Sequence, residues 1–130
     1  MSLERNRASA LLAACACAAS LTGSPAQAHH SAALFDREQP RTLTGTVREF
    51  QWTNPHCYIQ LLVRSDKGAD QEWSLEMGAP LHLYSNGWRP GTVRPGDKIV
   101  VTIFPLRGGG LGGEVQSATT IDGKSLGESR

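Results

Sequence analysis

Residues 42–52 read "TLTGTVREFQW", and this stretch carries the strongest indication of the fold. Small or apolar residues alternate with polar ones through its first half, at Leu43, Gly45 and Val47. That two-residue period is typical of a strand with one buried face. The period then shifts, so that Phe50 and Trp52 become the bulky positions. A phase shift after an internal glycine is typical of a bulged and strongly bent strand, so we predict a first strand that can serve two sheets.

Four further strands and one short helix are predicted from alternation, apolar runs and turn residues. The strands are expected at residues 56–63 (HCYIQLLV), 71–77 (QEWSLEM), 98–106 (KIVVTIFPL) and 114–121 (EVQSATTI). The helix is expected within residues 79–88, which place Pro80 near the start and Asn86-Gly87 as a stop signal. Because residues 98–106 are nearly all apolar, we expect that strand to be buried on both faces.

Three strands, a helix and two more strands follow one another in the order of the five-stranded Greek-key barrel known as the OB-fold. We therefore predict a mainly β chain: an OB-like barrel with one short helix between strands three and four. An open antiparallel sandwich is the alternative. The predicted organisation is a signal peptide at 1–28, an N-terminal arm at 29–41, the barrel at 42–122 and a polar tail at 123–130.

The start of the chain has the features of an export signal. Arg5 and Arg7 give a positive beginning, residues 8–21 form a short apolar run, and Ala26-Gln27-Ala28 ends it with small residues. The run is too short for a membrane span, so we expect a periplasmic or secreted protein without a transmembrane segment. A lipid-anchored form that begins at Cys15 is the less favoured alternative, because the apolar run before it would be very short.

Charge and cysteine content argue against a nucleic-acid partner and against a disulfide. Removal of residues 1–28 takes away Arg5, Arg7 and Glu4, which leaves 11 basic and 11 acidic side chains. With no basic excess to neutralise phosphates, we do not expect nucleic acid as a partner. Cys57 is the only cysteine that remains, so no intramolecular disulfide can form.

Several segments together resemble a family of small exported bacterial proteins that is catalogued as a domain of unknown function. They are residues 28–56 (AHHSAALFDREQPRTLTGTVREFQWTNPH), 72–76 (EWSLE) and 93–98 (VRPGDK). The shared features are a His-His-Ser opening and a Trp-x-Asn-Pro-His motif. The resemblance implies a periplasmic or secreted protein of OB-like fold, and it supplies no established activity.

Cleavage after Ala28 would make His29 the first residue. A terminal histidine offers two nitrogen donors, its free amine and its ring Nδ1, which together can chelate a metal ion. An α-amine with a pKa of about 7.7–8.0 is partly neutral at physiological pH. A third nitrogen from the fold would suit copper above the other first-row ions, with zinc second. His30 is a further candidate ligand. The alternative is that the His-His pair is only a polar chain end.

His56 is the candidate partner from the fold, since Asn54-Pro55 presents it at the start of a strand. We expect Asn54 to fix the imidazole tautomer by a hydrogen bond. The arm from His30 to Thr42 could span at most about 36 Å, so His29 can reach His56. His56 as a turn or packing residue is the equally weighted alternative.

The remaining candidates are weighed by strand alternation. Cys57 points away from His56 and shares its face with Ile59, so it is interpreted as a buried apolar residue and not as a nucleophile. Met77 is interpreted as core and His82 as a surface or packing residue. A possible ligand face outside the barrel consists of Trp52, Tyr58 and Gln60.

We therefore predict a small exported binding protein, not an enzyme, that binds a transition metal through His29, His30 and His56. The alternative is a metal-free interaction module that holds a peptide, a glycan or a partner protein on its aromatic face.

Overall fold

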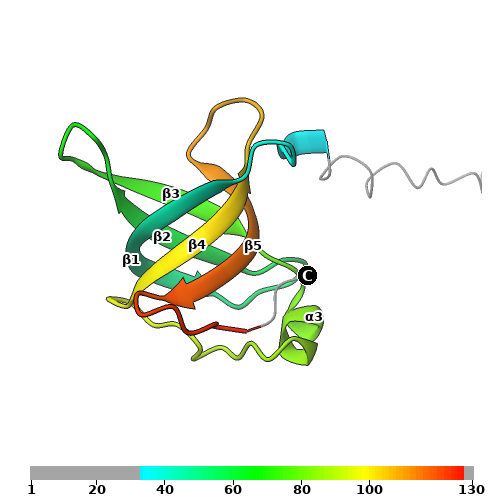
Figure 1. Cartoon of the computed structure of the whole chain (residues 1–130). Coiled ribbons are helices and arrows are strands. Elements are labelled where there is room, and N and C mark those ends of the chain that lie inside the picture. Colours follow the sequence, from blue (N-terminus) through cyan, green and yellow to red (C-terminus); the bar gives the residue numbers. More distant parts are fainter. Residues whose placement is uncertain (1–32, 128–130) are drawn as a thin grey trace, which may run out of the picture. The chain divides into compact units, whose positions relative to one another are not determined.

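Five strands and the short helix α3 lie within residues 33–127, the part of the chain that this computed structural model describes (Figure 1). The strands are β1 (Arg41–Gln51), β2 (Tyr58–Arg64), β3 (Asp70–Glu76), β4 (Lys98–Pro105) and β5 (Gly112–Thr120). The helix α3 (Pro80–Ser85) lies between β3 and β4 in the sequence.

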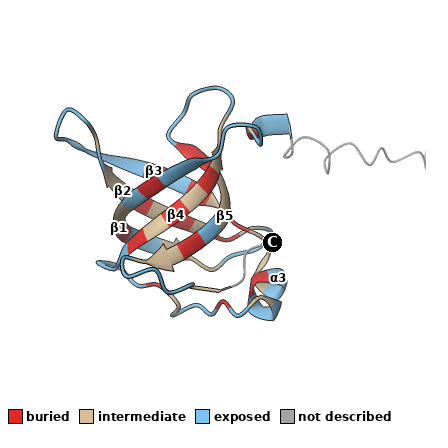
Figure 2. Cartoon of the chain, in the orientation of Figure 1, coloured by how far each residue is buried: buried red, intermediate tan, exposed pale blue. Residues whose placement is uncertain are grey.

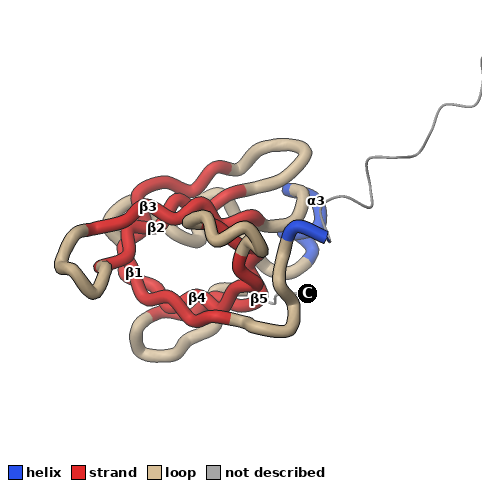
Figure 3. The backbone as a smooth tube through the Cα atoms, turned by 90° about the horizontal axis from the view of Figure 1, so that it is seen from above, coloured by secondary structure: helices blue, strands red, loops and turns tan. Residues whose placement is uncertain are grey.

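The strands close into a ring in the order β1-β2-β3-β5-β4, with β4 pairing back onto β1 (Figure 3). Neighbouring strands are antiparallel except β3 and β5, which run parallel. The chain leaves β3, passes through α3, crosses to β4 beside β1, and returns in β5 beside β3. This is the predicted mainly β, five-stranded Greek-key barrel with a short helix between strands three and four, and its closure excludes the open sandwich.

Strand β1 pairs with two different neighbours along its length because it bends. Residues 41–46 pair with β4, and residues 45–51 pair with β2. The register with β2 shifts between Val47 and Glu49. This confirms the bulge that the phase shift in the sequence predicts.

Gly45 lies where the two pairings of β1 overlap. A Cβ atom at this position would lie 2.5 Å from the carbonyl oxygen of Leu62 and 2.8 Å from Cγ of Leu61. Real Cβ atoms do not approach other heavy atoms so closely, and the nearer contact is backbone that cannot rotate away. Glycine therefore allows β1 and β2 to approach each other at the bend.

Buried residues alternate with more exposed ones along β2, β3 and β4, so one face of each of these strands fills the barrel (Figure 2). The fully buried side chains are Val47, Cys57, Ile59, Leu61, Leu75, Trp88, Ile99, Val101 and Ile103. Cys57 and Met77 both belong to this core, which confirms their interpretation as core residues.

The prediction that the fourth strand is buried on both faces is wrong. In β4, every second residue from Ile99 to Ile103 is buried, but Val100, Thr102 and Phe104 are only half-buried. A single barrel has one interior, so one face of each strand must point outward whatever its composition.

Helix α3 begins and ends at the expected signals. Pro80 occupies its first turn, and Gly87 follows its end with a φ of 86°. Leu83 is its buried residue, whereas Leu81 and Tyr84 are 80% and 55% exposed. Within residues 33–127 no helix has the length and apolar character that a membrane crossing requires.

The segment predicted as a polar tail folds back in part onto the barrel. Ser125 forms a β-bridge with Thr119, and the amide of Leu126 donates to the carbonyl of Ala118 at 3.0 Å. Gly127 lies against the buried ring of Trp88, because a Cβ atom there would be 2.5 Å from the indole Nε1. This contact covers one end of the core.

We predict that Gly45→Ala destabilises the protein by about 2–3 kcal/mol, because the added methyl group overpacks the bend against backbone. Gly108→Ala is the matched control, since a Cβ atom there meets nothing within 4 Å. The control should change the free energy of unfolding by less than about 0.5 kcal/mol. Urea denaturation followed by tryptophan fluorescence measures the free energy of unfolding of both variants. Equal effects would show that the close approach at Gly45 is not a constraint.

Candidate functional site

His56, the candidate ligand from the fold, lies between the Asn54-Pro55 turn and the start of β2. The hydroxyl of Thr53 donates to the carbonyl of His56 at 2.9 Å, so a hydrogen bond joins the residues on either side of the turn. The ladder between β2 and β3 continues past the strands, since the amides of Met77 and Cys57 bond the carbonyls of Cys57 and Gly78. Hydrogen bonds on both sides of His56 therefore hold its backbone in place.

Glu76 holds the ring of His56. Nδ1 of His56 lies 2.6 Å from Oε1 of Glu76, and the two side chains are 40% and 22% exposed. In the neutral imidazole, Nδ1 then carries the hydrogen and donates it to the carboxylate, which leaves the lone pair on Nε2. The tautomer is thus set by Glu76, the role that the sequence assigned to Asn54.

Glu76 also binds Tyr58, its direct partner across the β2–β3 ladder. Burial raises the pKa of the Tyr58 phenol, and the negative charge of Glu76 and the hydrogen bond between them raise it further. The neutral phenol donates to the carboxylate, whereas a phenolate would repel it. One carboxylate therefore organises both a histidine and a tyrosine.

A hollow of about 310 Å³ opens beside this cluster, and we call it the His56 hollow. Its polar and aromatic lining residues are Phe35, Arg37, His56, Glu76, His82, Glu114 and Gln116. Arg37 and Glu114 form an ion pair at 2.7 Å on one wall. On another wall, Nε2 of His82 lies 3.1 Å from the side-chain nitrogen of Asn86.

The N-terminal arm is anchored at the same hollow. Phe35 is 4% exposed and forms a β-bridge with Leu106. The amide of Asp36 donates to the carbonyl of Pro105 at 2.8 Å, and the amide of Arg107 donates to the carbonyl of Leu34 at 2.9 Å. The chain that leads back to His29 therefore starts from a fixed point beside His56.

The three residues of the predicted ligand face make different contacts. Trp52 packs edge-on against Phe50, with ring centroids 5.6 Å apart, and contacts the core. The side-chain amide of Gln60 donates to Gln51 and to Ser74, both at 3.2 Å. Tyr58 lines a smaller hollow of about 190 Å³ with Leu34 and Leu111, which we call the Tyr58 groove.

Cys57 belongs to the core and does not line the His56 hollow. Its side chain is fully buried on the face opposite His56, and burial raises the pKa of its thiol. The thiolate is therefore disfavoured at neutral pH, as expected for a small core residue.

Sequence reasoning did not single out Glu76 as a site residue. The signal that could have found it is cross-strand register, which a single sequence does not give. His29 and His30 lie outside the described residues. Within residues 33–127, no group of three or more His, Cys, Asp and Glu side chains is placed to hold a metal ion.

We predict that Glu76→Gln lowers the pKa of Tyr58, because the carboxylate charge that disfavours the phenolate is removed. The shift should be partial, since burial is the larger cause and remains. Absorbance at the tyrosinate band, titrated in a Tyr84→Phe background, isolates Tyr58 because the chain has two tyrosines. An unchanged titration would show that Glu76 does not contact the phenol in solution.

Comparison with known proteins places the chain in a family without giving it an activity. No curated protein and no solved structure matches it. The chain does match the description "Family of unknown function (DUF6152)" over residues 16–115. This match covers most of the 130 residues, including β1 to β4 and the start of β5. The protein therefore belongs to DUF6152, a family of unknown function.

Proposed function

We propose that the protein is a small exported binding protein that holds a transition-metal ion, copper before zinc, through His29, His30 and His56. Export to the periplasm or beyond, with cleavage after Ala28, is part of the proposal. The observation that carries it is the 2.6 Å contact between Nδ1 of His56 and Glu76. The proposal assigns no catalytic residue.

The carboxylate–imidazole contact supports a ligand role for His56. Metal-binding histidines usually donate their second ring nitrogen to a carboxylate or carbonyl, which fixes the ring and raises the basicity of the ligating nitrogen. Glu76 supplies this support through Nδ1, so Nε2 is the atom that would bind the ion. The half-exposed position of His56, at the edge of a hollow, leaves room for an ion to approach.

The anchored arm supports ligands from the mature N-terminus. His29 precedes Phe35 by six residues, a length of chain that spans at most about 20 Å. Because Phe35 lines the His56 hollow, this tether is shorter than the one counted back from Thr42. A short tether raises the effective concentration of the terminal histidine near His56.

The donor set that the proposal needs is rich in nitrogen. The terminal amine and Nδ1 of His29 would form a chelate ring, His56 would add a third nitrogen, and His30 is a further candidate. Imidazole and amine donors favour copper over the other divalent first-row ions. Zinc accepts the same ligands and ranks second.

A metal-free interaction module is the second candidate function, and the Tyr58 groove favours it. Leu34 and Leu111 flank Tyr58 in this groove and are 55% and 42% exposed. Exposed apolar side chains around an aromatic ring can hold a peptide, a glycan or a partner protein. In this alternative the histidines at positions 29 and 30 have no metal to bind.

We predict that the protein, expressed from Met1 and recovered after export, binds one Cu(II) with several nitrogen donors. Electron paramagnetic resonance should show nitrogen hyperfine couplings, and mass determination should place the first residue at His29. Insertion of one glycine between Ala28 and His29 should change the hyperfine pattern and the affinity, because the amine and Nδ1 then belong to different residues and can chelate together only through the amide between them.

His56→Ala should weaken copper binding, whereas His82→Gln, in the same hollow, is the matched control and should not. If the glycine insertion changes nothing, the terminal amine is not a ligand. If neither form binds copper, the metal proposal fails and the interaction module remains.

We predict that Glu76→Gln weakens copper binding by about 10-fold to 100-fold, the usual cost of losing the carboxylate that orients a histidine ligand. Glu72→Gln is the matched control on the same outward face of β3, where Glu72 pairs with Arg48 instead. Competition titrations against a chelator of known affinity compare the two. Equal affinities for both variants would show that Glu76 does not support a metal ligand.

A further inference from the structure

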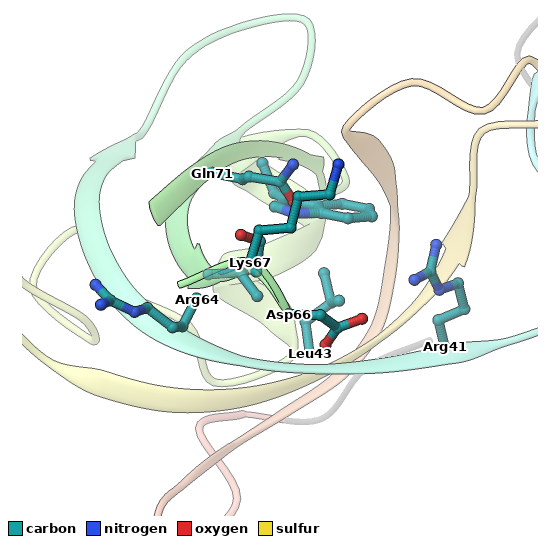
Figure 4. Close-up of a pocket in the computed structure, with 9 residues that line it drawn as sticks. Arg41, Leu43, Arg64, Asp66, Lys67 and Gln71 are labelled. Carbon is teal, nitrogen blue, oxygen red and sulfur yellow. The ribbon is translucent and has the colours of Figure 1, made fainter. Parts of the chain in front are cut away.

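Another hollow, of about 340 Å³, opens at the end of the barrel where β1 begins and the turn between β2 and β3 lies. Its apolar lining consists of Leu43, Val63 and Trp73, which point toward the core. Its rim carries Arg41, Arg64, Asp66, Lys67 and Gln71 (Figure 4). We call this hollow the basic mouth, after its three cationic side chains.

The cations of the basic mouth differ in how they are neutralised. Arg64 forms an ion pair with Asp70 at 3.2 Å. Within residues 33–127, neither Arg41 nor Lys67 forms an ion pair with a carboxylate. The guanidinium of Arg41 lies 5.3 Å from the ring centroid of Trp73, so it is held over an aromatic face.

The arrangement leaves two positive charges facing one space. Figure 4 shows the amine of Lys67 and the side-chain amide of Gln71 on one side of the hollow, with Arg41 on the other. Asp66 is the one carboxylate among the residues that line it. The charge around the hollow is therefore positive, although the chain without residues 1–28 has no net charge.

Trp73 adds an independent observation. Its ring lines the basic mouth and is 5% exposed, and its Nε1 is buried without a hydrogen-bond partner among the described residues. Indole Nε1 only donates, and buried donors in folded proteins are nearly always paired. A residue that lines the hollow thus has a buried, unsatisfied donor, as does Trp88 elsewhere in the described core, and two cations of the rim have no carboxylate partner among residues 33–127.

We infer that the basic mouth binds a small anion that carries a carboxylate or phosphate group. Its oxygens would accept from Arg41, Lys67 and Gln71, and a shift of the rim side chains would bring one of them to Nε1 of Trp73. A volume of about 340 Å³ suits a small molecule and not a polymer. This site is separate from His56, so it stands or falls independently of the metal proposal.

The inference is tested with the ¹⁵N-labelled, metal-free protein expressed from Met1. Its three tryptophans give three indole N–H resonances, and Trp73→Phe identifies the one from Trp73. Inorganic phosphate and citrate are titrated separately at constant ionic strength. The Trp73 indole should shift with saturation while those of Trp52 and Trp88 stay in place. The dissociation constants of phosphate and citrate are then compared. The anion with the lower dissociation constant shows whether the site prefers a phosphate or a carboxylate group.

Charge variants give opposite expected effects. Arg41→Gln and Lys67→Gln should each weaken binding about threefold to tenfold, the usual size for one partly exposed charge. Asp66→Asn should tighten binding by a similar factor, because it removes the carboxylate that repels the anion. Arg94→Gln removes a cation outside the lining of the hollow and should change nothing.

Unchanged Trp52 and Trp88 resonances show that each variant is folded. The inference is overturned if the Trp73 indole does not shift at millimolar anion. It is also overturned if sodium chloride alone produces the same shift, or if Arg94→Gln weakens binding as much as Arg41→Gln does.

Discussion

Closure of the five-stranded ring is the constraint on which the rest of the structure depends. A small barrel closes only if one strand bends far enough to pair with two neighbours, and β1 does so by pairing with β4 and then with β2. Gly45 permits the close approach at the bend, and the bulge between Val47 and Glu49 supplies the extra twist. The bend thus places β1 in register with both of its neighbours.

Register in turn decides which polar side chains meet on the outer surface. Pairing of Tyr58 with Glu76 brings the carboxylate beside the phenol and within reach of His56, which precedes β2 by two residues. A slip of one residue would turn Glu76 into the barrel and Leu75 outward, which burial forbids. The packing of Leu75 inside the barrel therefore fixes the position of Glu76 outside it.

The sequence predicts the strands and the helix better than it predicts the exposure and the contacts of their residues. Gly45 with its phase shift, Pro80 and Gly87 at the ends of α3, and the alternation around Cys57 are local signals, and the fold and core follow from them. The outward face of β4 and the exposure of Leu81 depend on what lies beside those residues, which local pattern does not contain. Glu76 was missed for the same reason, since its role depends on a partner strand.

The two histidines of the His56 hollow show why the supporting contact matters more than the residue type. His82 lies 3.1 Å from the side-chain nitrogen of Asn86 through Nε2, so an amide that donates there uses the lone pair of that nitrogen. Nδ1 of His56 instead contacts the carboxylate of Glu76. Because an ionised carboxylate can only accept a hydrogen bond, Nδ1 is the donor. The Nε2 lone pair is thus used within the fold in His82, whereas in His56 it is the lone pair that the proposed site would offer to a metal ion. Since both line one hollow, the difference between Glu76 and Asn86 selects His56 as the ligand in the proposed site.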